Sequence, residues 1–254
     1  MSRNLTVAVW GSNGAGTSTF SAALTLGLTK YFWNVFLVSG DKFLPAHDMW
    51  GIQSNVNERL PVESIGSILT YTNLTKEYIK ERVIYHPEHR DKAKIGLMGY
   101  LVDDDCQLYN PISGNAAQSL LNEVKKLFQV TIVDCTLPQT DSLTEKALQY
   151  ADIVITLLEP NAAGIGFVNA QSSFIRNNLS DGRRYIFMAA KVEPDSAVAE
   201  FEYRLGIRFD KLRLPYTKQA REKFNKLELF KKYDGDYRQT VDGIAERIME
   251  EAKE

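Results

Sequence analysis

Short apolar runs alternate along the chain with longer segments in which apolar residues recur at helical spacing. The apolar runs predict strands over residues 5–10, 35–38, 95–101, 130–133, 153–158 and 185–189. The helical spacing predicts helices near residues 17–31, 64–70, 76–83, 116–128, 142–150, 164–178, 217–226 and 241–252. Because the strands are continuous apolar runs and alternate with helices, both faces of their sheet should be covered. We therefore expect an α/β fold, a doubly wound and mostly parallel sheet with helices on both faces.

The composition places the chain among ordinary globular proteins. Hydrophobic residues make up 44% and charged residues 24%, and we find no repeat, low-complexity tract or flexible linker. A doubly wound sheet of this size is acceptable as one unit, so residues 1–254 are predicted to form a single domain. The formal net charge of -2 argues against a generally basic surface for nucleic acid.

The number of cysteines and the N-terminal segment indicate in which cellular compartment the protein is expected. The two cysteines, Cys106 and Cys135, are too few for a disulfide framework and are expected as reduced thiols. No charge occurs between Asn4 and Thr29, but the glycines in the middle of that stretch interrupt any signal peptide or membrane span. We expect a cytoplasmic protein without a membrane span.

A glycine-rich segment follows the first predicted strand and opens the first predicted helix. It reads Gly11-Ser12-Asn13-Gly14-Ala15-Gly16-Thr17-Ser18 and matches the P-loop pattern G-x4-G-K-[ST] at every fixed position but one. The glycines let successive backbone N–H groups point at phosphate oxygens, and the helix N-terminus favours negative charge. A glycine-rich turn without function is the alternative, but the strand before it and the hydroxyl residues after it favour phosphate binding. The predicted cofactor-binding residues are Gly11, Ser12, Asn13, Gly14, Ala15, Gly16, Thr17, Ser18 and Thr19.

Two carboxylates stand where such a site needs them. Asp41 follows the second predicted strand, and Asp134 ends the strand at residues 130–133. The carboxyl ends of parallel strands face the crevice in which ligands bind. We predict that Ser18, Asp41 and Asp134 hold Mg²⁺ and that Asp41 has a catalytic role in orienting water. A simple capping or solvent-facing carboxylate is the alternative for each residue taken alone.

The chain resembles the ParA/MinD-type P-loop ATPases, and within them the single-domain relatives of the pilus-localising TadZ/CpaE proteins. The resemblance runs from residue 5 to about residue 225. It implies ATP or ADP with Mg²⁺ as cofactors, and a homodimer or a heterodimer with a related ATPase, acting with an unknown protein partner. The segments that carry it are Val9-Trp10-Gly11-Ser12, Asp41-x-x-x-Pro45 with Trp50, Gly96-Leu97-Met98-Gly99-Tyr100, Ile132-Val133-Asp134-Cys135, Ala151-Asp152-Ile153-Val154-Ile155 and Leu214-Pro215-Tyr216.

The chain departs from this family at the lysines. Thr17 stands at the P-loop lysine, and Ser12 stands at the family's signature lysine, which reaches across a dimer. Ser39 and Ala190-Lys191 replace an aspartate and an asparagine of the family pattern. One lost transition-state donor costs about 10²–10³ in rate, and a charge supplied in trans is worth about 10³–10⁵. Hydrolysis should therefore be weak or absent.

Three functions follow from these residues. The leading hypothesis is a degenerate nucleotide-binding protein or pseudo-ATPase, with a degenerate Walker A motif, that positions or scaffolds a cellular machine. The second is a slow, active ATPase switch in which another lysine, Lys42 or Lys191, serves the phosphates. The third is a DNA-binding partition-type protein. This last function is not expected, since the basic segment 211–232 is followed by an acidic helix and a solvated helix face explains it as well.

Two further segments contain histidine residues that have both a functional and a purely structural interpretation. His86-Pro87-Glu88-His89 has the residues of a metal pair, but Pro87 interrupts the spacing and we expect an exposed loop. His47 and Trp50 are expected in a switch loop or on a dimer surface.

Overall fold

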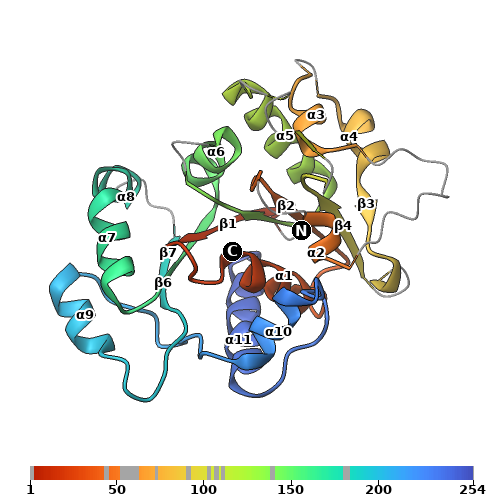
Figure 1. Cartoon of the computed structure of the whole chain (residues 1–254). Helices are drawn as coiled ribbons and strands as arrows, with labels where there is room; N and C mark the ends of the chain where they lie inside the picture. Colours follow the sequence, from red (N-terminus) through yellow and green to blue (C-terminus); the bar gives the residue numbers. More distant parts are fainter. Residues whose placement is uncertain are drawn as a thin grey trace.

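A sheet of seven strands forms the centre of the described structure (Figure 1). The computed structural model describes residues 3–42, 46–51, 63–71, 74–89, 93–101, 104–105, 109, 112–137, 141–179 and 184–253. The strands are β1 (Leu5–Gly11), β2 (Asn34–Ser39), β3 (Ile84–Tyr85), β4 (Lys94–Met98), β5 (Val130–Asp134), β6 (Ile153–Leu158) and β7 (Arg184–Ala189). Their order is β3-β4-β2-β5-β1-β6-β7, and β3 alone of these strands is antiparallel to its neighbour.

Helices cover both faces of this sheet, which confirms the expected fold class (Figure 1). One face carries α1 (Thr17–Leu28), α2 (Ala46–Met49) and α11 (Gly235–Glu251), with α10 (Lys218–Asn225) beside them. The other carries α3 (Ile65–Ile68), α4 (Lys76–Arg82), α5 (Gly114–Leu127), α6 (Ser142–Tyr150), α7 (Ala162–Ala170), α8 (Ser172–Leu179) and α9 (Val198–Leu205).

The period-2 geometry of the strands divides the core into two layers. Along β1, Val7 and Val9 pack on the face of α1 and α11, whereas Ala8 and Trp10 pack on the opposite face. All four residues are apolar because both faces are buried. The expected apolar stripe of the last helix, which includes Val241 and Ile248, is buried against the first layer.

Several element boundaries differ from the sequence expectations. The helix expected at 164–178 is two helices, α7 and α8, and α11 begins at Gly235 rather than at residue 241. The two-residue strand β3 and the helices α2 and α9 were not expected. β3 and α2 have too few residues for a periodic pattern to be recognised, whereas the eight residues of α9 are long enough and were overlooked.

The carboxyl ends of the central strands meet at one edge of the sheet, as expected. In the parallel register, Asp134 of β5 lies opposite Val9 of β1 on one side and opposite Ser39 of β2 on the other. The segment that follows β1 leads directly into α1 at this edge. The glycine-rich loop, the end of β2 and Asp134 are therefore neighbours.

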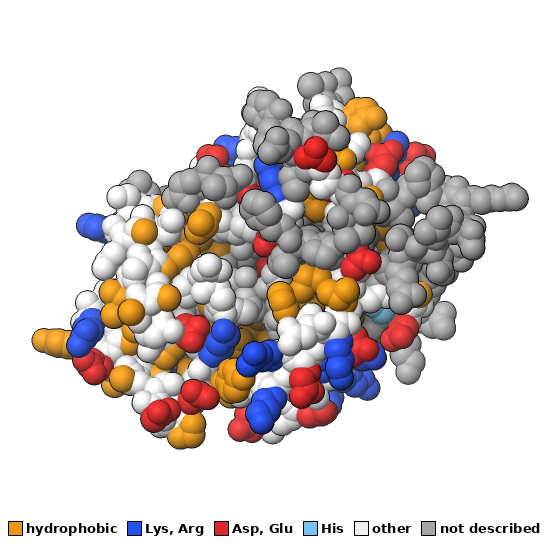
Figure 2. Space-filling model, viewed as in Figure 1, with side chains coloured by type: hydrophobic (Ala, Val, Ile, Leu, Met, Phe, Trp, Pro, Cys, Tyr) orange, Lys and Arg blue, Asp and Glu red, His pale blue; other side chains and the backbone are white. Residues whose placement is uncertain are grey.

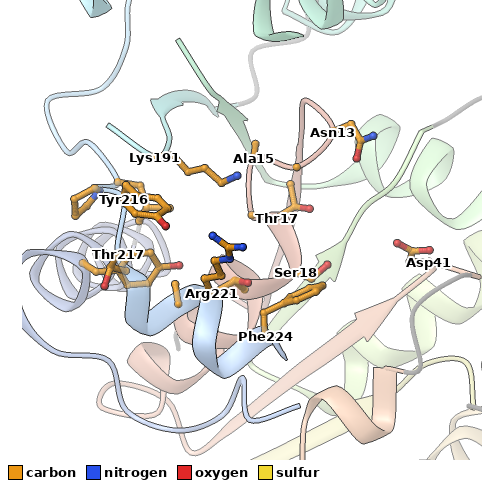
Figure 3. A pocket seen from close by; sticks show the side chains of 17 residues that line it. Asn13, Ala15, Thr17, Ser18, Asp41, Lys191, Tyr216, Thr217, Arg221 and Phe224 are labelled. Carbon is orange, nitrogen blue, oxygen red and sulfur yellow. The ribbon is translucent and has the colours of Figure 1, made fainter. Parts of the chain in front are cut away.

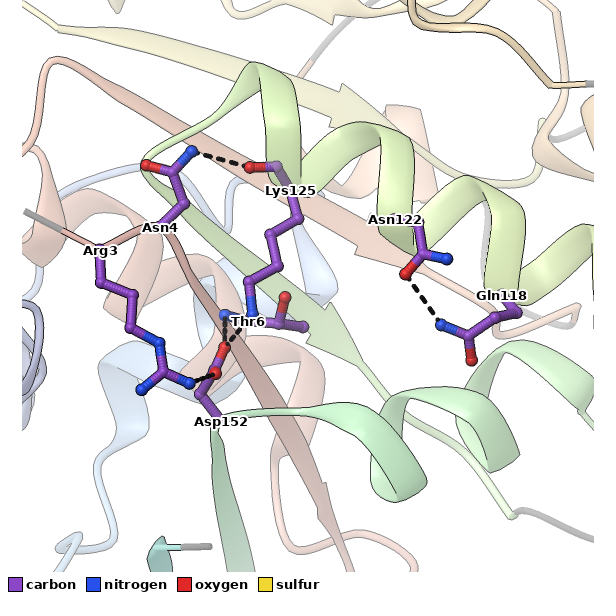
Figure 4. A network of polar contacts seen from close by, with 7 residues as sticks. All are labelled: Arg3, Asn4, Thr6, Gln118, Asn122, Lys125 and Asp152. Atoms are coloured by element: carbon purple, nitrogen blue, oxygen red, sulfur yellow. Dashed lines mark hydrogen bonds and ion pairs between the residues drawn. The ribbon is translucent and has the colours of Figure 1, made fainter.

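Asp152 stabilises the opposite, amino edge of the sheet (Figure 4). One carboxylate oxygen accepts hydrogen bonds from the Thr6 backbone N–H at 2.8 Å and from Lys125 Nζ at 2.7 Å, and the other accepts one from Arg3. The carboxylate is only 10% exposed and joins the N-terminal segment, α5 and the start of β6.

We expect Asp152→Ala to lower the free energy of unfolding by about 1–3 kcal/mol, because it leaves the Thr6 N–H and two cations without their acceptor. The change is measured by chemical denaturation. Asp195→Ala is the control, since Asp195 is exposed and has no ion pair within the described ranges, and it should change stability by less than about 0.5 kcal/mol. Equal stability of the two variants would contradict this role.

Some expected surface features are buried instead. Trp50, expected in a switch loop or on a dimer surface, packs into the core beside Phe230, because Gly99 leaves room for its ring. His86, expected in an exposed loop, is also buried and packs on Phe230. Cys135 is buried, whereas Cys106 and Pro45 lie outside the described residues. Among the described helices, none is both long and apolar enough to cross a membrane.

Candidate functional site

The loop between β1 and α1 presents backbone N–H groups to an open space. Gly14 and Gly16 have φ of 78° and 89°, a left-handed conformation that glycine adopts without strain. A Cβ built on either glycine would meet no described atom within 4 Å. Gly16 is the N-cap of α1, and no side chain of the described residues caps this helix end. The first amides of α1 are therefore available to an anion.

A cavity of about 560 Å³ opens in front of this loop (Figure 3). Its walls come from the loop, the end of β2, the segment after β7, α10 and the start of α11. The described residues that line it are Asn13, Gly14, Ala15, Gly16, Thr17, Ser18, Thr19, Asp41, Lys191, Leu214, Pro215, Tyr216, Thr217, Ala220, Arg221, Phe224 and Tyr237. One wall is polar and the opposite wall is largely apolar and aromatic, as in many small-molecule sites.

Asp134 lies beneath the loop and not in the cavity lining. Its carboxylate is buried and accepts hydrogen bonds from Ser39 Oγ at 3.2 Å, from Ser21 Oγ at 3.4 Å and from the Ser18 side chain. The pKa of Asp134 is raised to about 7, mainly because burial disfavours the charged carboxylate; the three hydroxyl donors lower this pKa and the charge of Asp41 adds to the rise. A divalent cation held at Ser18 would favour the ionised carboxylate.

The predicted binding residues do not all reach the cavity. Residues 13–19 line it together with Asp41. Gly11 instead pairs with Leu157 of β6, and a Cβ there would lie 2.1 Å from the Leu157 carbonyl oxygen. Ser12 is only 2% exposed, and its hydroxyl accepts a hydrogen bond from the Glu159 N–H at 3.5 Å. Gly11 and Ser12 therefore anchor the loop to the backbone of β6 and Glu159 and do not line the cavity.

The two lysines considered as replacements differ in position. Lys191 lines the cavity, and its ammonium lies 3.6 Å from a carboxylate oxygen of Glu159. It has a φ of 53°, unusual for a residue with a Cβ, and Figure 3 shows its side chain extending toward the loop near Ala15. Lys42 is absent from the described lining, and its charge acts on Asp141 instead.

Sequence reasoning missed the contribution of α10. Thr217, Ala220, Arg221 and Phe224 line the cavity, and their spacing of three and four residues puts them on one helix face. The signal was present in the sequence, but Arg221 belongs to the basic segment 211–232, for which the alternatives from sequence are a solvated helix face and DNA binding, not a place in the phosphate site. Figure 3 shows its guanidinium group pointing from α10 toward the loop that carries Thr17 and Ser18.

The rest of the basic segment has mixed roles. Lys223 is buried, with its ammonium over the Tyr233 ring at 4.8 Å and donating to the Lys232 carbonyl. Lys231 forms an ion pair with Glu228. On the face seen in Figure 2, Lys and Arg side chains are interspersed with Asp and Glu over the part where α10 and α11 lie.

The residues present fit a nucleotide phosphate group with Mg²⁺. The open loop amides suit phosphate oxygens, while the Ser18 hydroxyl and the carboxylates of Asp41 and Asp134 provide the oxygen ligands that Mg²⁺ prefers. Among the described residues, no group of three or more His, Cys, Asp or Glu side chains forms a separate metal site. With Ser18, Asp41 and Asp134 as the protein ligands, phosphate oxygens and water would supply the remaining ligands of a Mg²⁺ ion.

Three solved structures resemble this chain at full length. A ParA family ATPase from Chlorobium tepidum has a TM-score of 0.74 at 14% identity, covering 97% of this chain and 99% of that one. A plasmid partition protein from Borrelia burgdorferi bound to AMPPNP has a TM-score of 0.74 at 16% identity, covering 98% and 99%. The septum site-determining protein MinD from Pyrococcus horikoshii, complexed with Mg-ADP, has a TM-score of 0.70 at 14% identity, covering 98% and 96%.

Likeness at the level of sequence is much weaker. No protein-family model and no curated protein sequence matches this chain. At identities of 14–16%, the structural likeness establishes the fold alone. The chain therefore has the fold of the ParA/MinD-type P-loop ATPases.

Proposed function

We propose that this protein binds ATP or ADP with Mg²⁺ at the loop formed by residues 13–19 and hydrolyses ATP weakly or not at all. The observation that carries the proposal is an uncapped helix N-terminus, with open glycine amides, at the wall of a cavity of about 560 Å³. The Borrelia and Pyrococcus relatives were solved with AMPPNP and with Mg-ADP, which supports the choice of nucleotide.

The expected weakness of hydrolysis rests on two neutral side chains. Thr17 occupies the P-loop lysine position and lines the cavity with a hydroxyl, a weaker donor to phosphate than an ammonium group. Ser12 occupies the position of the signature lysine and is buried against the backbone of Glu159. The loop therefore offers a built phosphate site with a Walker A motif that has lost both lysines.

When bound, Mg²⁺ would neutralise charge on the phosphate oxygens. Ser18 would hold the cation directly, Asp134 would hold one of its waters or act through Ser18, and Asp41 at the cavity wall would orient a water molecule. The aromatic and apolar wall formed by Tyr216 and Phe224 is the surface available to the base.

In a cell, we propose that the protein positions or scaffolds a larger machine, as a homodimer or together with a related ATPase and a further protein partner. The relatives that support this role include plasmid partition and cell-division proteins, and one of them was solved as a MinC:MinD complex from Aquifex aeolicus. The closer likeness to TadZ/CpaE-type proteins remains part of this proposal.

The test is calorimetric titration with Mg-ATP and Mg-ADP together with steady-state phosphate release. The proposal predicts saturable binding of one nucleotide per chain and phosphate release near the background rate. Turnover at a rate typical of partition ATPases would contradict the pseudo-ATPase account and favour the slow-switch alternative. The position of Lys191 in the cavity lining is the observation that favours this alternative. Absence of any nucleotide binding would overturn both.

A DNA-binding role is expected to be minor. The basic residues of segment 211–232 include one that lines the cavity and one that is buried, and Figure 2 shows charges of both signs over α10 and α11. We therefore expect a Kd for random duplex DNA of about 10 µM or weaker at near-physiological salt. Submicromolar binding with a steep salt dependence, measured by fluorescence anisotropy, would contradict this prediction and support a partition-type function.

A further inference from the structure

The cavity in front of the loop carries more positive than negative charge. Among the described residues that line it, Lys191 and Arg221 are cationic, and Asp41 is the acidic residue. Lys191 shares its charge with Glu159 at 3.6 Å. Arg221 differs, because its side chain makes no hydrogen bond or ion pair with any residue that the structure describes.

The position of Arg221 is built by α10. The helix begins at Lys218, is capped by the Thr217 side chain, and turns residues 217, 220, 221 and 224 toward the cavity. In Figure 3 the guanidinium group projects from α10 into the cavity, toward the loop that carries Thr17 and Ser18. A guanidinium group is always charged and offers a fork of five N–H donors that matches phosphate oxygens.

We propose that Arg221 supplies the phosphate-binding cation that Thr17 cannot supply. This inference rests on the proposed nucleotide-binding function and identifies the residue through which the chain holds the phosphates despite its altered loop. The arginine approaches from α10 across the cavity and not from the loop itself. Nucleotide binding would thus join α10 to the N-terminus of α1.

The inference predicts a specific loss of affinity. A charge-assisted hydrogen bond to phosphate, once removed, lowers affinity by about 10- to 100-fold, so Arg221→Gln should weaken Mg-ATP binding by that factor. Lys218→Gln is the matched control. It removes the same charge from the same helix at an exposed residue that is not in the described cavity lining, and it should change affinity by less than about twofold.

A double-mutant cycle separates a phosphate contact from a structural role. In a Thr17→Lys background, the restored lysine of the loop should also bind the nucleotide phosphates. Arg221→Gln should then cost about threefold or less, because the two residues act on the same phosphates. Arg221→Lys should retain part of the wild-type affinity, since it keeps the charge but loses the fork. Calorimetry with Mg-ATP measures each variant, and thermal melting confirms that each is folded.

The outcomes distinguish this inference from the proposed function. If the wild type binds Mg-ATP and Arg221→Gln binds it equally well, the inference is wrong and the proposed function stands. An equal loss from Arg221→Gln in the wild-type and Thr17→Lys backgrounds would also overturn it, because the two side chains would then not share a ligand. If the wild type binds no nucleotide, the proposed function fails and this inference fails with it.

Discussion

Thr17→Lys is expected to raise the affinity for Mg-ATP about 10-fold. This is the lower end of the gain from one charge-assisted hydrogen bond of about 1.5–3 kcal/mol, because Arg221 is proposed to act on the same phosphates already. The structure gives a reason to expect such a gain from one substitution. Thr17 is the first residue of α1 and lines the cavity, and the glycine amides, Ser18 and Asp134 are already in place beside it. A lysine at this position adds a cation to a site whose other parts are built.

The rate of hydrolysis should rise much less than the affinity. Ser12 would still be neutral, since it is a serine buried against the backbone of Glu159 and supplies no second cation. Calorimetry and phosphate release measure the two quantities. Thr29→Lys is the matched control, because it makes the same substitution at the C-cap of the same helix. If Thr17→Lys and Thr29→Lys bind Mg-ATP equally, the loop is not the phosphate site.

Gly11→Ala is expected to destabilise the whole fold. The added Cβ would lie 2.1 Å from the carbonyl oxygen of Leu157, a backbone atom of the neighbouring strand β6 that cannot rotate away. Relief requires separation of β1 from β6 at the centre of the sheet. We expect the free energy of unfolding to fall by about 3 kcal/mol, the upper end of the usual range for overpacking, as measured by chemical denaturation.

Gly166→Ala is the control for this substitution. Gly166 lies within α7, and a Cβ there meets no described atom within 4 Å. Removing a helical glycine without a clash should raise stability by about 0.5–1 kcal/mol. The two variants add the same methyl group and are expected to change stability in opposite directions. A Gly11→Ala protein as stable as the wild type would contradict the register between Gly11 and Leu157.

The strand ends and the loop could be predicted from the sequence because their signals are local. A buried strand such as residues 5–10 is recognised by its continuous apolar run, and the loop after it by the spacing of Gly11, Gly14 and Gly16. Parallel strands place their carboxyl ends at one edge, which brought Asp41 and Asp134 to the loop without further information.

The two cationic residues of the described cavity lining, Lys191 and Arg221, could not be predicted in the same way. α10 has few apolar residues, so its sequence does not indicate which face is turned inward, and the choice is made by packing beside α1 and α11. The left-handed backbone at Lys191 likewise has no local sequence signal. Arg221 and Lys223 therefore read as surface charge, although one lines the cavity and the other is buried.

Hydrogen exchange at the start of α1 tests the central claim most directly. The N–H groups of Thr17, Ser18 and Thr19 have no intrahelical acceptor, and no described side chain caps them. They should exchange rapidly in the free protein. If nucleotide phosphate binds at this loop, saturating Mg-ATP should slow exchange at residues 14–19 and leave the amino edge of the sheet near Asp152 unchanged. Bound nucleotide with unaltered exchange at residues 14–19 would show that the phosphates bind elsewhere and would contradict the account.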